Sequence, residues 1–254
     1  MSTQIAAQLY TLRNFTKTPA DIAQTLKKVK SIGYDAVQLS GLGPIDTKEL
    51  HSILDGEGLT VCATHTSYER MRDEMEAVIE EHTILGCKNL AIGGLPTAYR
   101  KDADSYKQFA KEASALAETL AERGFTWSYH NHSFELEKFD GRTALSILYE
   151  ESDPRYFLAE IDTYWIQHGG GDPAQWIIDL KGRIKLLHLK DMAMKGREQL
   201  MAEVGEGNLN WPRILAAAKE AEVEWYIVEQ DICQRDPFES LAISLRNMQA
   251  MGLR

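Results

Sequence analysis

The stretch KKVKSIGYDAVQLSG, residues 27–41, decides the fold. Its first half is charged and amphipathic, Gly33 interrupts it, and a short apolar run follows at once. A glycine directly after a helical segment is a common helix stop, and a short β-branched or aromatic run between turns is typical of a strand. The same order returns in EHTILGCKNLAIGG (81–94), ETLAERGFTWSYHNH (118–132) and, without the glycine, AAKEAEVEWYIVEQD (217–231). The sequence therefore predicts repeated units of helix followed by strand.

Working outward from this unit, we expect eight strands, at residues 4–10, 35–40, 59–64, 89–93, 125–130, 156–162, 184–189 and 225–229. Helices are predicted between them, at residues 19–32, 68–86, 104–123, 143–150, 173–181 and 210–222. Alternating strands and helices indicate parallel βαβ units. Eight units in 254 residues favour a closed (β/α)₈ barrel over an open doubly wound sheet, and no G-x-G-x-x-G pattern follows the first strand. No linker divides the chain, so residues 1–254 are predicted to form one α/β domain.

The composition disfavours several classes of partner. A formal net charge of −10 and a pI near 5.2 oppose binding to a phosphate backbone, so we expect no nucleic acid. Cys62, Cys87 and Cys233 are widely spaced and odd in number, which favours reduced thiols over disulfides or a CxxC metal site. No secretory signal and no apolar run long enough to span a bilayer are visible. We therefore expect no membrane partner and a cytoplasmic location.

Ionisable residues gather where the predicted strands end. Residues two apart on a strand share a face, and chemistry in a (β/α)₈ barrel collects at the C-terminal strand ends. The third strand ends near His65, and four later strand ends carry such pairs: His130 with His132, Glu160 with Asp162, His188 with Lys190, and Glu229 with Asp231. Charged side chains in apolar runs are costly to bury unless they are paired or bind a metal. Mixed His, Asp and Glu ligands without thiolates suit Mn²⁺, Mg²⁺, Co²⁺ or Zn²⁺, and we favour Mn²⁺.

Several of these residues also have a plainer interpretation. Asp162 could cap the loop after its strand, and His188, flanked by leucines, could be a core histidine with satisfied hydrogen bonds. Lys190 could simply neutralise nearby carboxylates. His65 could be a hydrogen-bonded pocket histidine, and we take it as a candidate for substrate binding.

Four further residues are candidates for substrate contacts. Gln8 on the first strand could face the pocket. Trp165 and Trp211 could stack against the apolar face of a substrate or pack in the core. Glu206 lies in the glycine-flanked loop at residues 205–207, where it could bind substrate hydroxyls or cap the turn.

Seven motifs carry a family resemblance: QLYTLR (8–13), YHNHSFEL (129–136), EIDTYW (160–165), GGGDP (169–173), IKLLHLKD (184–191), VGEGNLNW (204–211) and YIVEQD (226–231). Through them nearly the whole chain resembles the xylose isomerase-like TIM-barrel family, in its sugar phosphate isomerase/epimerase branch. The resemblance implies a divalent metal at the barrel mouth, held by Asp162, His188 and Glu229. It places His130 where relatives usually have a glutamate, with His132 and Glu135 as alternative fourth ligands.

The resemblance implies an isomerase or epimerase that acts on a sugar or keto-sugar through an enediolate. Glu229 is the expected base, with His132 or Lys190 as the opposing acid. Loss of a β-hydroxyl from the same intermediate would instead make the protein a dehydratase of an inosose-like or 3-keto-sugar substrate, an alternative that His130 in place of a glutamate favours. The expected partners are a small carbohydrate and, from the resemblance, a second copy of the chain in a homodimer.

Two other functions fit the sequence less well. An endonuclease IV-like DNA repair enzyme would need more His and Glu ligands and basic DNA-binding loops, whereas this chain has seven histidines and a net charge of −10. A non-catalytic sugar-binding barrel would have no physical reason to keep Asp162, His188 and Glu229 buried together.

Overall fold

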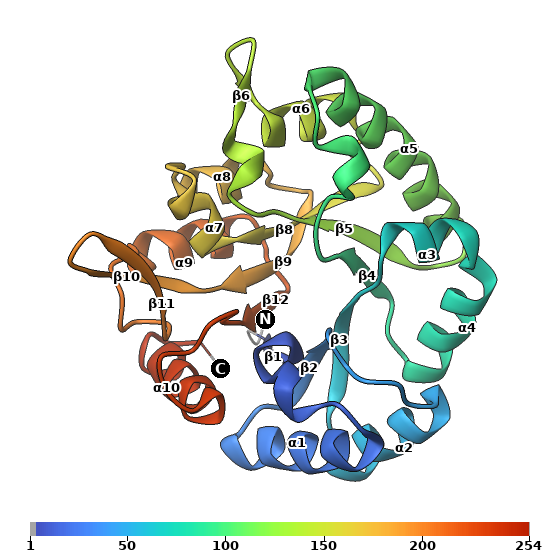
Figure 1. The fold of residues 1–254 in the computed structure, drawn as a ribbon, viewed down its shortest axis with the longest axis vertical. Coiled ribbons are helices and arrows are strands. Elements are labelled where there is room, and N and C mark those ends of the chain that lie inside the picture. The colour runs from blue at the N-terminus through green and yellow to red at the C-terminus, as the bar shows by residue number, and fades with distance from the viewer. Residues whose placement is uncertain (1–3, 254) are drawn as a thin grey trace.

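A closed ring of parallel strands forms the centre of the molecule. In the computed structural model, which describes residues 4–253, the strand order around the ring is β1-β12-β9-β8-β5-β4-β3-β2 (Figure 1). The strands are β1 Gln4–Gln8, β2 Ala36–Leu39, β3 Thr60–His65, β4 Asn89–Ile92, β5 Thr126–His130, β8 Phe157–Asp162, β9 Ile184–Leu189 and β12 Trp225–Val228. The predicted (β/α)₈ barrel is confirmed, and each predicted strand is present. The predicted domain extends to residues 1–3 and 254, which lie outside the described residues.

Helices cover the outside of this ring (Figure 1). They are α1 Pro19–Ile32, α2 Thr47–Glu57, α3 Tyr68–Asp73, α4 Met75–Leu85, α5 Ala103–Glu122, α6 Ala144–Glu151, α7 Thr163–His168, α8 Pro173–Asp179, α9 Trp211–Glu220 and α10 Pro237–Ala250. Short 3₁₀ helices lie at η1 Leu9–Phe15, η2 Thr97–Tyr99 and η3 Phe134–Leu136. Within residues 4–253 we find no helix that is both long and apolar enough to cross a membrane.

The two ends of helix α1 show why residues 27–41 fold as a helix that stops before a strand. Thr18 and Asp21 form a reciprocal capping box at its start, which satisfies backbone N–H groups that a helix leaves free. Gly33 ends the helix at φ 116°, a left-handed conformation that a side chain would oppose. The predicted stop at Gly33 is therefore confirmed.

Some predicted boundaries were wrong for local reasons. The helix expected at residues 68–86 is divided at Glu74, whose φ of −129° leaves helical geometry. The first strand ends at Gln8, because the Gln8 side chain accepts a hydrogen bond from the backbone of Tyr10 and starts η1. Helices α2, α7 and α10 were not predicted, although Asp236 before α10 was an available capping signal.

Side chains inside the ring change from apolar to polar along the strands. A small apolar cluster fills the interior, formed by Ala6, Ala36, Cys62, Ala63, Leu186 and Ile227. Because inward positions recur every second residue, the next inward residues toward the C-terminal ends are Gln8, Gln38, His188 and Glu229. The strand period thus places a polar layer directly above an apolar floor.

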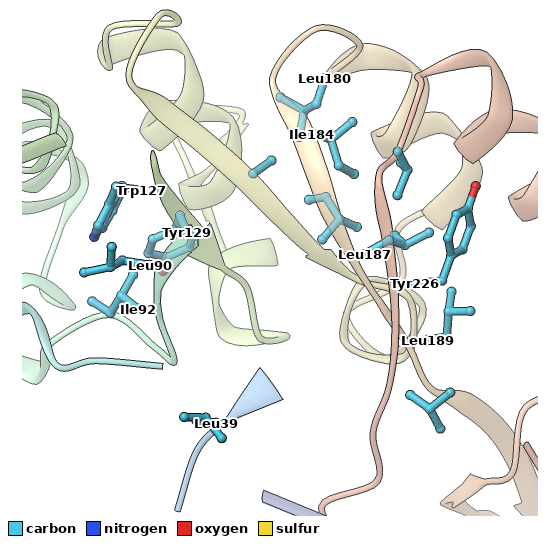
Figure 2. Packing of buried hydrophobic residues seen from close by; sticks show 14 of the residues in the cluster. Leu39, Leu90, Ile92, Trp127, Tyr129, Leu180, Ile184, Leu187, Leu189 and Tyr226 are labelled. Atoms are coloured by element: carbon cyan, nitrogen blue, oxygen red, sulfur yellow. The ribbon is translucent and has the colours of Figure 1, made fainter. Parts of the chain in front are cut away.

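Outward-facing residues of the same strands join the large core under the helices. Figure 2 shows Trp127 and Tyr129 on β5 and Leu187 on β9 among these side chains, all fully buried. Burying an aromatic or leucine side chain contributes about 1.5–3 kcal/mol relative to exposure. This packing fixes the strands whose inward residues form the polar layer.

Two hairpins extend the C-terminal side of the ring: β6 Lys138–Phe139 with β7 Arg142–Thr143, and β10 Asp191–Lys195 with β11 Glu198–Ala202. The second hairpin leads into the loop at residues 205–207, which folds around the fully buried Asp191. The Asp191 carboxylate accepts N–H groups from Met192, Gly205, Gly207 and Leu209, and also from the indole of Trp211. The loop is therefore anchored by an internal acceptor.

Candidate active site and metal centre

Four side chains from four strand ends meet in the mouth of the barrel. His130 ends β5, Asp162 ends β8, His188 lies near the end of β9, and Glu229 follows β12. All four are buried, and their possible ligand atoms lie within 4.8 Å of one another. Nδ1 of His188 is 2.8 Å from Oε2 of Glu229, and Nε2 of His130 is 3.2 Å from Oδ2 of Asp162. The fold thus brings together the residues predicted as metal ligands.

A buried ammonium group lies beside these ligands. Nζ of Lys190 is 3.0 Å from Oδ2 of Asp162, 2.7 Å from Oε2 of Glu229 and 2.7 Å from Oδ2 of Asp231. The Lys190 side chain is 1% exposed, whereas that of Asp231 is 24% exposed. Lys190 therefore does neutralise carboxylates, as the plainer interpretation had it, and it does so within the cluster itself.

Mutual attraction keeps the acidic members of the cluster charged. Burial alone would raise the pKa of Glu229, but Lys190 and His188 hold it well below its usual range. The pKa of Asp162 is also lowered, since Lys190 and His130 outweigh the cost of burial. Burial would lower the pKa of His188, yet the carboxylates of Glu160 and Glu229 raise it to about 10. Both carboxylates are therefore charged at neutral pH.

The two histidines of the HNH stretch behave differently from His188. Burial, followed by repulsion from His188, lowers the pKa of His130. Burial, followed by repulsion from His130 and Lys190, lowers the pKa of His132 to about 3. Both imidazoles are therefore neutral at pH 7, so His132 can accept a proton or hydrogen bond more readily than it can donate as an imidazolium.

The donor set fits a divalent cation. Nδ1 of His130 is buried and has no hydrogen-bond partner among residues 4–253. Because no partner fixes the His130 tautomer, its proton can rest on Nδ1 and leave the Nε2 lone pair facing Asp162. Two imidazole nitrogens and two carboxylates suit a borderline or hard divalent ion. These four residues would hold such an ion.

A network of hydrogen-bonded polar side chains lies beneath the ligand cluster. Fully buried Gln8 donates to Oε1 of Gln38 at 2.7 Å, and Gln38 donates to Oε1 of Glu160 at 2.6 Å. Nε2 of His65 lies 2.7 Å from the other oxygen of Glu160. Gln8 thus belongs to an internal hydrogen-bond network, and the sequence analysis missed Gln38. A glutamine on the apolar strand AVQL was the signal that could have identified it.

An aromatic wall borders one side of the mouth. The ring of His132 lies 5.4 Å from that of Trp165 and 5.7 Å from that of Phe134. Nε1 of Trp165 and Nδ1 of His132 are buried without a hydrogen-bond partner in the described part of the chain. Nζ of Lys190 is 5.6 Å from the centre of the Trp165 ring. The wall therefore joins an apolar surface to polar atoms with unused hydrogen-bonding capacity.

A model of the xylose isomerase-like TIM barrel family matches residues 26–250. The chain belongs to the xylose isomerase-like TIM barrel family. It is 24% identical over 268 residues to the rhizopine catabolism protein MocC of Rhizobium meliloti. This alignment covers 91% of this chain and 82% of MocC.

Solved structures with the same fold include a sugar phosphate isomerase/epimerase from Parabacteroides distasonis. Its TM-score is 0.81 at 24% identity, with 100% of this chain and 96% of that chain covered. The probable 3-DHS dehydratase AsbF, involved in petrobactin synthesis, from Bacillus anthracis has a TM-score of 0.73 at 13% identity, with 97% of this chain and 99% of that chain covered. At these identities the likeness establishes the xylose isomerase-like fold alone.

Two candidates lie outside the ligand cluster of this xylose isomerase-like barrel. Glu135 is fully buried and accepts the Tyr129 hydroxyl and the backbone N–H of His132, so it holds the HNH turn in place. Glu206 is exposed and accepts a hydrogen bond from Asn247 of α10 at 3.1 Å, which favours the turn-stabilising interpretation over a sugar contact.

The two oxygens of the Asp162 carboxylate have different partners. Its Oδ1 accepts the backbone N–H of Trp165 at 3.0 Å and so caps α7. Its Oδ2 faces His130 and Lys190 in the cluster. The helix cap therefore fixes the orientation of the carboxylate that the site uses.

Proposed function

We propose that this protein is a divalent-metal-dependent isomerase or epimerase of a sugar or keto-sugar, with Mn²⁺ as the favoured ion. The observation that supports this most is the convergence of His130, Asp162, His188 and Glu229 with their ligand atoms within 4.8 Å. Membership of the family adds support, because a solved structure of the same fold is a sugar phosphate isomerase/epimerase.

The cation and the chain would divide the work. A divalent ion held by the four ligands would polarise a substrate carbonyl and acidify the neighbouring C–H bond. Glu229, charged at neutral pH, takes the proton from that carbon and leaves an enediolate. The Lys190 ammonium, which contacts Asp162, Glu229 and Asp231, would turn one N–H toward the substrate and stabilise the developing negative charge on oxygen.

The destination of the proton separates the reactions. Isomerisation returns it to the neighbouring carbon, whereas epimerisation returns a proton to the opposite face of the same carbon. His132 and Lys190 are the groups proposed for that second transfer. Neutral His132 would first have to receive the proton that it later delivers, since its pKa is lowered to about 3. The Trp165 ring would pack against C–H groups of the sugar.

A dehydratase is the alternative function. His130 supplies a neutral nitrogen where the resemblance leads us to expect a glutamate, which leaves Glu229 as the single glutamate in the ligand set. Epimerisation by two glutamates, one on each face of the same carbon, then lacks one of its two groups. Elimination of a β-hydroxyl, by contrast, needs one base and one acid. The probable 3-DHS dehydratase of the same fold supports keeping this alternative.

The test is solvent deuterium exchange. The purified chain is stripped with a chelator, reloaded with Mn²⁺, and incubated in D₂O with ketoses, keto-sugars and inososes while NMR follows each substrate. Metal-dependent deuterium incorporation without loss of water is the expected result. Loss of water would replace the proposal with the dehydratase. A metal-loaded protein that exchanges no deuterium into any member of the panel would contradict both functions. In a separate assay, nicking of abasic DNA would indicate the repair activity.

A further inference from the structure

One fully buried carboxylate has no role in the proposed chemistry. Glu160 lies on β8, two residues before Asp162, and faces into the barrel beneath the ligand cluster. Its Oε2 is 2.7 Å from Nε2 of His65, and its Oε1 is 2.6 Å from Nε2 of Gln38 and 3.2 Å from Nε2 of His188. Strands β2, β3 and β9, which lie around the same ring as β8, supply these three partners (Figure 1).

The hydrogen-bond directions in this network follow from the Glu160 carboxylate. An ionised carboxylate only accepts, so Gln38 presents its amide N–H to Glu160 and turns its own oxygen away. That oxygen accepts from Gln8 and lies 2.7 Å from Nε2 of His188. Since both nearby acceptors of His188 Nε2 are oxygens, this nitrogen must carry a proton.

The proton on Nε2 determines which His188 nitrogen can bind a cation. With Nε2 protonated, Nδ1 is the nitrogen that His188 can offer to a cation in exchange for its second proton, and it lies 2.8 Å from Oε2 of Glu229. The ring is also held in plane by His65, whose ring stacks on it at 5.4 Å with an interplanar angle of 18°. His65 is itself fixed by Glu160.

The same atoms do not favour a second cation site. His65, Glu160 and His188 offer ligand atoms within 4.8 Å of one another. However, the Glu160 oxygens already accept N–H groups from His65 and Gln38, with His188 also within reach. A cation there would have to displace these donors from a fully buried position, at the cost of leaving them without partners.

We infer that Glu160 is a positioning residue, which through Gln38 and His65 holds His188 with Nδ1 directed at the ligand cluster. This inference rests on the proposed metal centre. Outer partners of this kind orient a ligating histidine and raise its basicity, and their removal typically lowers metal affinity about 10- to 100-fold.

The test compares Glu160→Gln with a matched control. Glu203→Gln makes the same change in another buried carboxylate, which accepts the Ser240 hydroxyl at 2.6 Å, away from the site. Mn²⁺ affinity is measured by calorimetry, and ¹⁵N NMR of the histidine rings reports which nitrogen carries the proton. Glu160→Gln should bind Mn²⁺ at least about 10-fold more weakly and change the Nε2 signals of His65 and His188, and the control should do neither.

Two results would overturn the inference: wild-type Mn²⁺ affinity in Glu160→Gln, or unchanged ring-nitrogen signals of His188. If Glu160→Gln does not fold, Gln38→Met removes one link of the same network and should weaken Mn²⁺ binding several-fold, with an unchanged affinity counting against the inference. If the wild-type chain binds no divalent ion, the proposed function fails, and the NMR comparison alone then decides the role of Glu160.

Discussion

Two buried acidic regions lie side by side at the barrel mouth and are stabilised in different ways. Asp191 is fully buried, and every hydrogen bond that it accepts comes from backbone N–H groups and one indole. Asp162 and Glu229 are equally buried, but their close partners include the ammonium of Lys190 and the imidazoles of His130 and His188. The first region holds a loop, whereas the second consists of charged and titratable side chains paired with one another.

The difference teaches how to separate structural from chemical carboxylates. N–H groups of a folded loop cannot leave without unfolding it, so Asp191 has no capacity to spare for a ligand. Side-chain cations and imidazoles can exchange protons or move, so Asp162 and Glu229 can take another partner. Glu135 is a third case, because it is buried with two neutral donors and, within residues 4–253, forms no salt bridge.

Glu229→Gln should have the largest effect. It removes the proposed base and one ligand while leaving the shape of the side chain, so deuterium exchange into the active substrate should fall by about 10³-fold or more. NMR exchange rates measure this. The matched control is Glu224→Gln, which changes an exposed carboxylate paired with Lys185 just before the same strand. Substantial exchange by Glu229→Gln would assign the base to another residue.

Asp191→Ala should act on stability instead. Five N–H donors lose their acceptor in a buried loop, and we expect the free energy of unfolding to fall by about 4 kcal/mol. Urea unfolding followed by circular dichroism measures the change. Asp236→Ala, which removes the N-cap of α10, should cost only about 1 kcal/mol. Equal costs in the two variants would mean that the Asp191 loop is not an anchor.

Glu135→Gln should reveal a pH dependence. Burial raises the pKa of Glu135 from 4.5 to about 7, so between these values the folded state holds a proton that the unfolded chain has lost. The stability that Glu135 contributes is thus complete below its unfolded pKa and falls as pH rises toward 7. From pH 5 to pH 8, the unfolding free energy of the wild type should drop relative to the variant by about 2 kcal/mol. Urea unfolding measures these free energies. An equal difference between wild type and variant at the two pH values would contradict the prediction.

The ring of strands was predictable from short sequence patterns, and the four residues that meet at its mouth were identified by the two-residue strand period together with the family resemblance. The turn at Gly33 and the two-residue period that pairs His188 with Lys190 are local features. Gln38 was not predictable in the same way, since Glu160 and His188 lie 122 and 150 residues away and meet it only once the barrel closes. The partners of Asp191 lie within 20 residues, but they face it only once the loop has folded. For Glu206 the glycine neighbours allow either a substrate contact or a turn cap, and only the fold shows that the loop turns inward around Asp191.

Lys190→Met should have the smallest of these effects and should be opposite in sign. The Lys190 ammonium lies within 3.0 Å of both Asp162 and Glu229, so it competes with any cation for the same oxygens. Replacing it with an uncharged side chain of similar length leaves those carboxylates less neutralised. Mn²⁺ should then bind about tenfold more tightly, which corresponds to about 1.4 kcal/mol, while deuterium exchange falls because the proposed acid is missing.

Calorimetry with Mn²⁺ measures this affinity, and Lys185→Met is the matched control. Lys185 lies on the same strand, but its ammonium pairs with the exposed Glu224, so its loss should leave Mn²⁺ binding unchanged. Weaker Mn²⁺ binding in Lys190→Met would mean that the ammonium helps to shape the ligand set rather than competing for it. In that case Asp162 and Glu229 would resemble Asp191, as carboxylates held by a fixed donor, and the distinction between the two regions would be lost.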